Sequence, residues 1–219
     1  MLGQNFRNKL IAKWTKEKGV FTKLLEQGIK ILLIKECKKI RNIKIDITST
    51  STQIIKGEIQ KIKISAEDIN YKDVFFDELR LESDNLNINF KLTTKELFFT
   101  NDPLIEFKIS WSQDSLKKIL LSKNWNWIGD NISKEILNKE KLIDIKIKNA
   151  QLLMRASKKD IDINQDEKIN IKTEKGKVYL ENKTYNKKIQ IPIEDKIYIK
   201  NINIENNLIN VFASSSISF

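Results

Sequence analysis

Apolar and polar residues alternate with a period of two along most of the chain after residue 42. Ile43, Ile45 and Ile47 alternate with Lys44 and Asp46. The same alternation recurs over residues 62–64, 86–92, 105–111, 143–147, 189–193, 197–199 and 202–204. Such alternation of β-branched and polar residues is typical of strands with one apolar and one wet face. It favours antiparallel pairing, because strands of parallel sheets are apolar on both faces.

Helical spacing replaces this pattern in two places. Phe21, Leu25, Ile29 and Leu32 form one face of an expected helix over residues 20–40, and its apolar stripe is so wide that we expect it to be largely enclosed. In mid-chain, Ser112–Ser115 resembles a helix start, and apolar residues at helical spacing continue to about residue 139. The order helix, sheet, helix, sheet indicates an α+β fold.

The expected architecture follows from the large apolar face that so many strands form, because other elements must cover this face. Few helices are available, so we expect a large curved antiparallel sheet wrapped around the long N-terminal helix, with a helical insertion in mid-chain. A half-rolled sheet of this kind leaves an elongated apolar groove. We expect residues 1–19 to form a basic amphipathic helix and residues 20–219 to form a single α+β domain.

Positive charge is concentrated near the N-terminus. Of the formal net charge of +11, residues 1–44 contribute +9, from twelve basic and three acidic residues. Such asymmetry indicates an anionic partner, either a membrane surface or a nucleic acid. On a membrane, the basic side chains of the first helix would meet the lipid headgroups, and its apolar side chains would enter the interface. The alternative is a solvated helix that packs on the rest of the protein. The membrane-surface candidates there are Phe6, Lys9, Leu10, Lys13, Trp14 and Lys16.

Trp125 and Trp127 lie on either side of Asn126, between the two apolar runs of the mid-chain insertion. Tryptophan favours membrane interfaces, so this pair is a further membrane-surface candidate. The alternative is that the two rings cap the open end of the curved sheet.

Residues with catalytic or metal-binding chemistry are scarce. Histidine is absent and Cys37 is the only cysteine, which excludes an internal disulfide and the commonest general base and metal ligands. The acidic run 160–166 resembles a calcium loop, but Gln165 and Ile171 stand where Gly and Glu are needed. We therefore expect no enzyme activity, no metal and no cofactor.

One stretch, KGEIQKIKISAEDINYKDVFFDELRLESDNLNINFKL at residues 56–92, resembles the LmeA-type phospholipid-binding family of bacteria, most closely its cyanobacterial branch. The resemblance rests on Gly57 at a strand start, an alternating strand ending at Ala66, Tyr71 after a short turn, and the segment from Trp111 into the next helix. It covers roughly residues 20–155. It implies a curved sheet around a helix, with an apolar cavity for phospholipid. Envelope members of that family carry an N-terminal signal or anchor, which this sequence does not show.

We therefore expect non-catalytic binding, and possibly transfer, of phospholipid at a membrane surface. The candidates for lining the groove are Leu25, Ile29, Leu32, Leu33, Ile62, Ile64, Leu79 and Leu81; the alternative is that the helical members simply fill the core. A basic module for nucleic acid or a protein partner is the competing hypothesis. The expected location is the cytoplasm or the cytoplasmic face of a membrane, because no apolar run is long enough to be a signal or a span. Exposed strand edges would allow a dimer.

Overall fold

The computed structural model describes residues 19–91, 96–157 and 165–216. Within them the chain is α+β, with two antiparallel sheets and four helices. The helices are α2 (Val20–Glu36), α3 (Ser51–Ile55), α4 (Gln113–Leu120) and α5 (Asn126–Leu137). The strands are β1 (Lys39–Thr48), β2 (Glu58–Tyr71), β3 (Val74–Lys91), β4 (Glu96–Phe99), β5 (Leu104–Ser112), β6 (Lys141–Lys148), β7 (Gln151–Ser157), β8 (Glu167–Glu174), β9 (Lys177–Asn182), β10 (Lys187–Gln190), β11 (Ile197–Glu205) and β12 (Leu208–Ser216).

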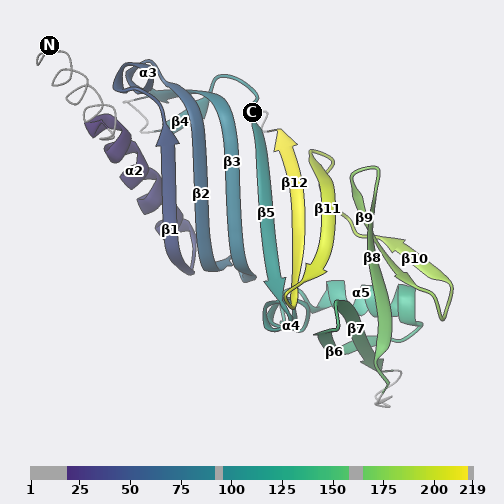
Figure 1. Ribbon diagram of the computed structural model, residues 1–219. Coiled ribbons are helices and arrows are strands. Elements are labelled where there is room, and N and C mark those ends of the chain that lie inside the picture. The colour runs from purple at the N-terminus through teal and green to yellow at the C-terminus, as the bar shows by residue number, and fades with distance from the viewer. Residues whose placement is uncertain (1–18, 92–95, 158–164, 217–219) are drawn as a thin grey trace, which may run out of the picture.

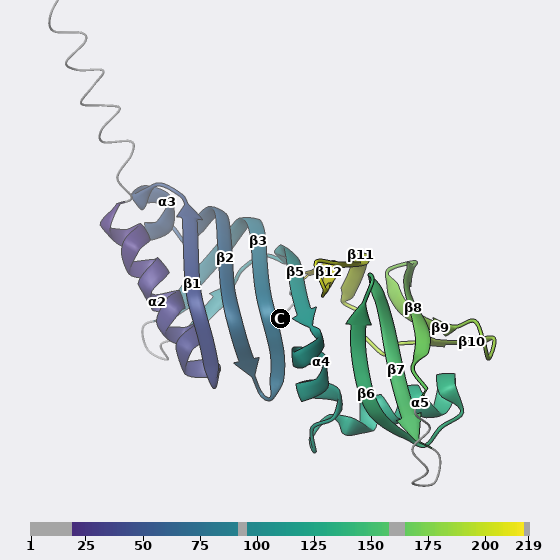
Figure 2. The ribbon, with the colours of Figure 1, turned by 60° about the horizontal axis from the view of Figure 1, so that its bottom comes forward.

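The first sheet has seven strands in the order β1-β2-β3-β5-β12-β11, with β4 paired to β3. The second has five strands in the order β10-β9-β8-β7-β6. Helix α2 lies at the β1 end of the first sheet, and the second sheet lies at the opposite end of the molecule (Figures 1 and 2). Helices α4 and α5 occur between β5 and β6 in the chain, and α5 packs on β6, β9 and β10.

The two faces of the first sheet are separated by chemistry, as the alternating pattern predicts. On one face Ile64 pairs with both Ile45 and Leu81, and Leu81 pairs with Phe107. On the other face Lys63 stands opposite Asp46 and Glu82. Successive side chains of a strand point to opposite faces. One face of this sheet is therefore apolar and the other is charged.

The apolar side chains form two separate cores. The larger core joins the second sheet and α5 to β11 and β12, and contains Ile136, Ile145 and Met154, each at most 1% exposed. The smaller core contains Ile47, Ile59 and Leu86, with Leu25 and Ile29 of α2 packed against it. Burial of a large aliphatic side chain stabilises a fold by roughly 1.5–3 kcal/mol, so the larger core carries most of the stability.

The structure corrects the expected enclosure of the N-terminal helix. Helix α2 ends at Glu36 because Cys37 is extended. It packs on β1 and α3, while large apolar side chains on its other side are exposed. Among the described residues nothing encloses this helix. The width of its apolar stripe therefore reflects two different apolar faces, only one of which meets the sheet.

The phase of the alternation slips by one residue between Ile199 and Ile202 in the sequence. The structure places both in the single strand β11, with an irregularity in its pairing to β12 between Ile199 and Asn201. One extra residue at such a bulge restores the apolar side chains to the same face. The two short apolar runs at 197–199 and 202–204 thus belong to one strand rather than two.

We expect Gly57→Ala to lower the free energy of unfolding by about 3 kcal/mol. Gly57 has φ +80°, and an added Cβ would lie 2.0 Å from the backbone oxygen of Ile88, which cannot swing aside. The matched control is Gly28→Ala in α2, where nothing lies within 4 Å and alanine favours the helix by about 0.5–1 kcal/mol. Urea unfolding measures both, and equal effects would contradict the close approach at Gly57.

Candidate functional site

The orientation of α2 is set by contacts on its inner side. Thr22 is 1% exposed, Leu25 and Ile29 pack on the smaller core, and Glu26 accepts a hydrogen bond from the backbone N–H of Ile47 at 2.9 Å. Residues three and four apart share one side of a helix. These contacts therefore also determine which residues point away from the sheet.

The outward side of α2 is apolar and exposed. Leu24 and Ile31 are 63% and 65% exposed. The α2 apolar face consists of Val20, Phe21, Leu24, Ile31, Leu32 and Ile34. Ile55 of the adjacent α3 is also exposed. Contiguous exposed apolar side chains are uncommon on monomeric proteins and mark interaction surfaces.

Basic residues accompany this face. Lys23, Lys30 and Lys35 lie on α2, and Lys38, Lys39 and Arg41 follow it. Residues 20–41 hold these six bases against two acids, Glu26 and Glu36, a net charge of +4. Lysine and arginine beside an exposed apolar helical face are the composition of interfacial helices.

The predicted lipid-groove residues are divided between two environments. Ile62, Ile64, Leu79 and Leu81 share the apolar face of the first sheet. Leu25 and Ile29 meet that face at its β1 end, and Leu33 is half-buried, but Leu32 points outward with 57% exposure. The structure therefore places four of the predicted residues on one sheet face and packs Leu25 and Ile29 at its β1 end, whereas Leu32 points away from that face; that they line a lipid groove stays a prediction.

A strip of this sheet face lies between the two cores. We call Ile64, Leu79, Leu81 and Ile109 the central strip; they are half-buried and belong to neither core. Pairing of Leu79 with Ile109 and of Leu81 with Ile64 makes the strip continuous across β2, β3 and β5. Ile109 was not among the predicted lining residues, although its strand showed the same alternation.

The tryptophan pair also separates. Trp127 is 54% exposed at the start of α5, and its contact with a membrane stays a prediction. Trp125 is half-buried, and its indole N–H is buried without a hydrogen-bond partner. Most of the expected 1–19 helix lies outside the described residues, and so does the start of the 160–166 acidic run. The membrane-surface candidates on that helix are therefore not described: Phe6, Lys9, Leu10, Lys13, Trp14 and Lys16.

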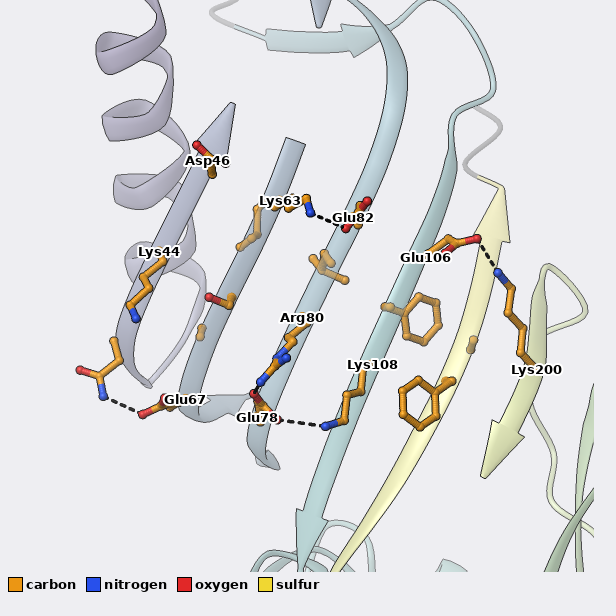
Figure 3. A pocket seen from close by; sticks show the side chains of 18 residues that line it. Lys44, Asp46, Lys63, Glu67, Glu78, Arg80, Glu82, Glu106, Lys108 and Lys200 are labelled. Carbon is orange, nitrogen blue, oxygen red and sulfur yellow. Dashed lines mark hydrogen bonds and ion pairs between the residues drawn. The ribbon is translucent and has the colours of Figure 1, made fainter. Parts of the chain in front are cut away.

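The charged face of the first sheet contains a hollow of about 560 Å³. Figure 3 shows its cations and carboxylates projecting from neighbouring strands. Lys108 Nζ lies 3.3 Å from Glu78, and Lys200 Nζ lies 2.5 Å from Glu106. The bases lining the hollow are Lys44, Lys63, Arg80, Lys108 and Lys200, and the acids are Asp46, Glu67, Glu78, Glu82 and Glu106. Five bases against five acids leave no net charge to attract a phosphate backbone.

The pKa shifts in this hollow follow from the same pairing. Partial burial would raise the pKa of Glu78, but Arg80 and Lys108 bring it below its usual value. A hydrogen bond from Lys61 lowers the pKa of Glu82. These carboxylates are held ionised, as acceptors for neighbouring cations. The arrangement is that of a cross-strand charge lattice, in which neither carboxylate is tuned to exchange protons near neutral pH.

Asp144 of β6 joins three elements and provides a pH-dependent prediction. It accepts a hydrogen bond from Ile145 N–H, lies 2.7 Å from Lys117 of α4 and 3.3 Å from Arg155 of β7, and is 15% exposed. Burial alone would raise its pKa, but Lys117 and the other donors lower it. A carboxyl with a lowered folded-state pKa stabilises the fold above its unfolded pKa of about 3.9, and this contribution disappears as pH falls through the folded-state value.

We therefore expect Asp144→Asn to cost about 1–2 kcal/mol at pH 7, with the difference from the unsubstituted chain vanishing toward pH 2. Urea unfolding across this pH range measures it. The control is Asp102→Asn, at an exposed carboxylate before β5, which should change little at any pH. A cost for Asp144→Asn that persists at pH 2 would mean that the carboxylate's charge is not the cause.

No described helix combines the length and apolar character needed to cross a membrane. No group of three or more Cys, Asp or Glu side chains within residues 19–91, 96–157 and 165–216 is placed to hold a metal ion.

Comparison with protein-family models, curated proteins and solved structures finds no match. The resemblance of residues 56–92 to the LmeA-type family therefore stays a prediction.

Proposed function

We propose that this protein binds phospholipid at an anionic membrane surface, without catalysis, and that the α2 apolar face is its point of contact. The observation that carries the proposal is the set of exposed apolar side chains on one side of a helix whose other side is anchored in the fold. The lysines of α2 complement anionic headgroups. The LmeA-type resemblance agrees with this function and forms part of the proposal.

The energies are sufficient for reversible attachment. Six side chains that are about half exposed would each gain on the order of 1 kcal/mol by entering the interface. Each basic residue near an anionic surface adds about 1 kcal/mol. With the three lysines of α2 counted, the total is about 9 kcal/mol, which corresponds to binding slightly tighter than micromolar and suits a peripheral protein.

The central strip is the proposed place for an acyl chain of the bound phospholipid. The central strip offers a half-buried apolar path across β2, β3 and β5, and it begins one strand in from β1, on which α2 packs. An acyl chain from a bilayer bound at α2 would lie along this strip. In this picture the first sheet curves around the lipid, while α2 stays at its β1 edge.

The experiment is co-sedimentation with phosphatidylcholine vesicles, with and without phosphatidylserine, at low and high salt. We expect strong binding only with phosphatidylserine, and partial loss at high salt because surface charges are screened while apolar insertion remains. Equal failure to bind both vesicle types would overturn the proposal. A mobility shift with DNA or RNA in that case would favour the basic nucleic-acid module instead.

A further inference from the structure

One end of the first sheet gathers three turns of the chain at a single carboxylate. Asp73, in the β2–β3 turn, accepts hydrogen bonds from Lys38 Nζ at 2.7 Å and from Asn124 Nδ2 at 3.1 Å. Lys38 follows the C-terminal end of α2, and Asn124 lies between α4 and α5. Figure 1 shows the β2–β3 turn and α4 at the same end of the sheet. Asp73 therefore holds the end of α2, the β2–β3 turn and the α4–α5 turn beside one another.

The α4–α5 turn is compact. The backbone N–H groups of Trp125 and Asn126 both donate to the backbone oxygen of Ser122, at 3.2 and 2.8 Å. Ser122 Oγ donates to the backbone oxygen of the buried Ile119 at 2.8 Å. These bonds fix the turn to the buried side of α4. The side chains next to Ser122 along the chain, including that of Leu121, are therefore set in position.

The exposed side chains at this end of the sheet are basic, aromatic and aliphatic. We call five exposed residues the sheet-end surface: Tyr71, Lys72, Lys118, Leu121 and Lys123. Lys72 Nζ lies 5.1 Å from the centre of the Tyr71 ring, and Lys118 Nζ lies 5.7 Å from the centre of the Phe75 ring. These contacts place the lysines of the β2–β3 turn and of α4 against aromatic rings of the same hairpin.

Positive charge dominates the sheet-end surface. Residues 115–129 hold three lysines and no acid, and the exposed Asp114 lies at the opposite end of α4. The acid of the β2–β3 turn, Asp73, is already bonded to Lys38 and Asn124. An anionic partner is therefore attracted to this end of the sheet.

We propose that the sheet-end surface is a second contact with anionic phospholipid headgroups, so that the bilayer meets the protein both at α2 and at this end of the first sheet. This inference rests on membrane binding through the α2 apolar face. Tyrosine and lysine suit the headgroup region, where an aromatic ring and an ammonium group both stay partly hydrated. A nucleic acid would engage the lysines but leave Leu121 without a role.

The second contact would set the orientation of the protein. Figure 2 shows α4 separated from α2 by β1, β2 and β3. At about 4.8 Å between neighbouring strands, the two contacts are on the order of 15–20 Å apart. A contact through α2 alone leaves the molecule free to turn about the helix axis. Two contacts at this spacing turn the β2–β3 end of the sheet toward the bilayer.

The first test attaches the environment-sensitive dye NBD to Leu121→Cys in the full chain, in a Cys37→Ser background that leaves no other thiol. Phosphatidylserine vesicles should shift the dye emission to the blue and raise it, because the dye leaves water. The same dye at Leu24→Cys reports the α2 contact. The control is the dye at Lys187→Cys, an exposed position on β10 of the second sheet, which should not respond.

The second test is co-sedimentation of Lys118→Ala/Lys123→Ala with phosphatidylserine vesicles. Each lysine near an anionic surface contributes about fivefold to affinity, so this chain should bind up to about 25-fold more weakly. The control Lys183→Ala/Lys187→Ala removes the same charge from exposed positions on the second sheet. It should bind less than about twofold more weakly, because salt screens charges farther than about 10 Å from the surface.

Separate results would overturn this inference and the membrane function. A dye at Leu121→Cys that stays in water while the dye at Leu24→Cys responds would overturn the second contact and leave the α2 contact intact. Equal losses in the two double-lysine variants would also overturn it. A dye at Leu121→Cys that responds to DNA or RNA, and not to vesicles, would assign this end of the sheet to nucleic acid instead. A chain that fails to co-sediment with vesicles at all would refute the membrane function, and this inference with it.

Discussion

The Leu24→Glu/Ile31→Glu chain is expected to bind phosphatidylserine vesicles at least about 100-fold more weakly than the unsubstituted protein. Both side chains are more than 60% exposed on the outward side of α2. The two substitutions remove on the order of 2 kcal/mol of apolar insertion and add two charges that anionic headgroups repel. Since 1.4 kcal/mol is a factor of ten in affinity, a loss near 3 kcal/mol gives this result. Co-sedimentation measures it.

Stability should be unaffected by these substitutions, because neither side chain packs on a described core. The control is Leu104→Glu/Asn131→Glu, which makes the same change in net charge at exposed positions on β5 and α5. This chain should lose only the small part of binding that depends on net charge. Equal loss in both chains would show that α2 is not the contact surface.

Glu167→Gln should lower the free energy of unfolding by about 3–5 kcal/mol, the cost of leaving one charge of a buried ion pair alone. Lys139 and Glu167 are 6% and 5% exposed, and Lys139 Nζ lies 3.8 Å from Glu167 Oε1. The ammonium is buried and makes no hydrogen bond. Tyr185 donates its hydroxyl to Glu167 at 3.0 Å, which the amide oxygen of glutamine would still accept.

Urea unfolding of three variants separates charge from packing. Lys139→Met/Glu167→Leu removes both charges and should fall within about 1 kcal/mol of the starting stability. Glu174→Gln breaks the exposed pair with Lys188 and should cost less than about 1 kcal/mol. If Glu167→Gln lowers the free energy of unfolding no more than Glu174→Gln does, an unpaired charge at Lys139 is not costly and the prediction is wrong.

The strands were predictable because alternation reports directly which residues of a strand are buried. The helix at Ser112 was predictable as well, and Ser112 Oγ accepts a hydrogen bond from Ser115 N–H as the N-cap. Alternation does not report which strand pairs with which. Division of the strands into two sheets, and insertion of β12 between β5 and β11, depend on long-range contacts that leave no local pattern.

The candidate site was only partly predictable for a related reason. A helix with apolar residues on two sides looks the same in sequence whether one or both are covered, so Leu25 and Leu32 received the same expectation although one is packed and the other exposed. The buried pair of Lys139 and Glu167, which lies outside the candidate site, carries no pattern at all, because charged residues are abundant in this chain. Their positions become informative only once burial is known.

The position of β12 has a consequence for how the chain acquires its structure. Strand β5 ends at Ser112, but the neighbour that covers its second edge begins only at Leu208. During synthesis, β1 to β5 can pair early, while β5 keeps a row of unpaired N–H and C=O groups until β12 has left the ribosome. Such an edge recruits other strands, and closing so long a loop slows folding. We therefore expect nascent chains of this protein to expose the second edge of β5 until β12 pairs with it, and β5 is the strand that we expect a chaperone to shield.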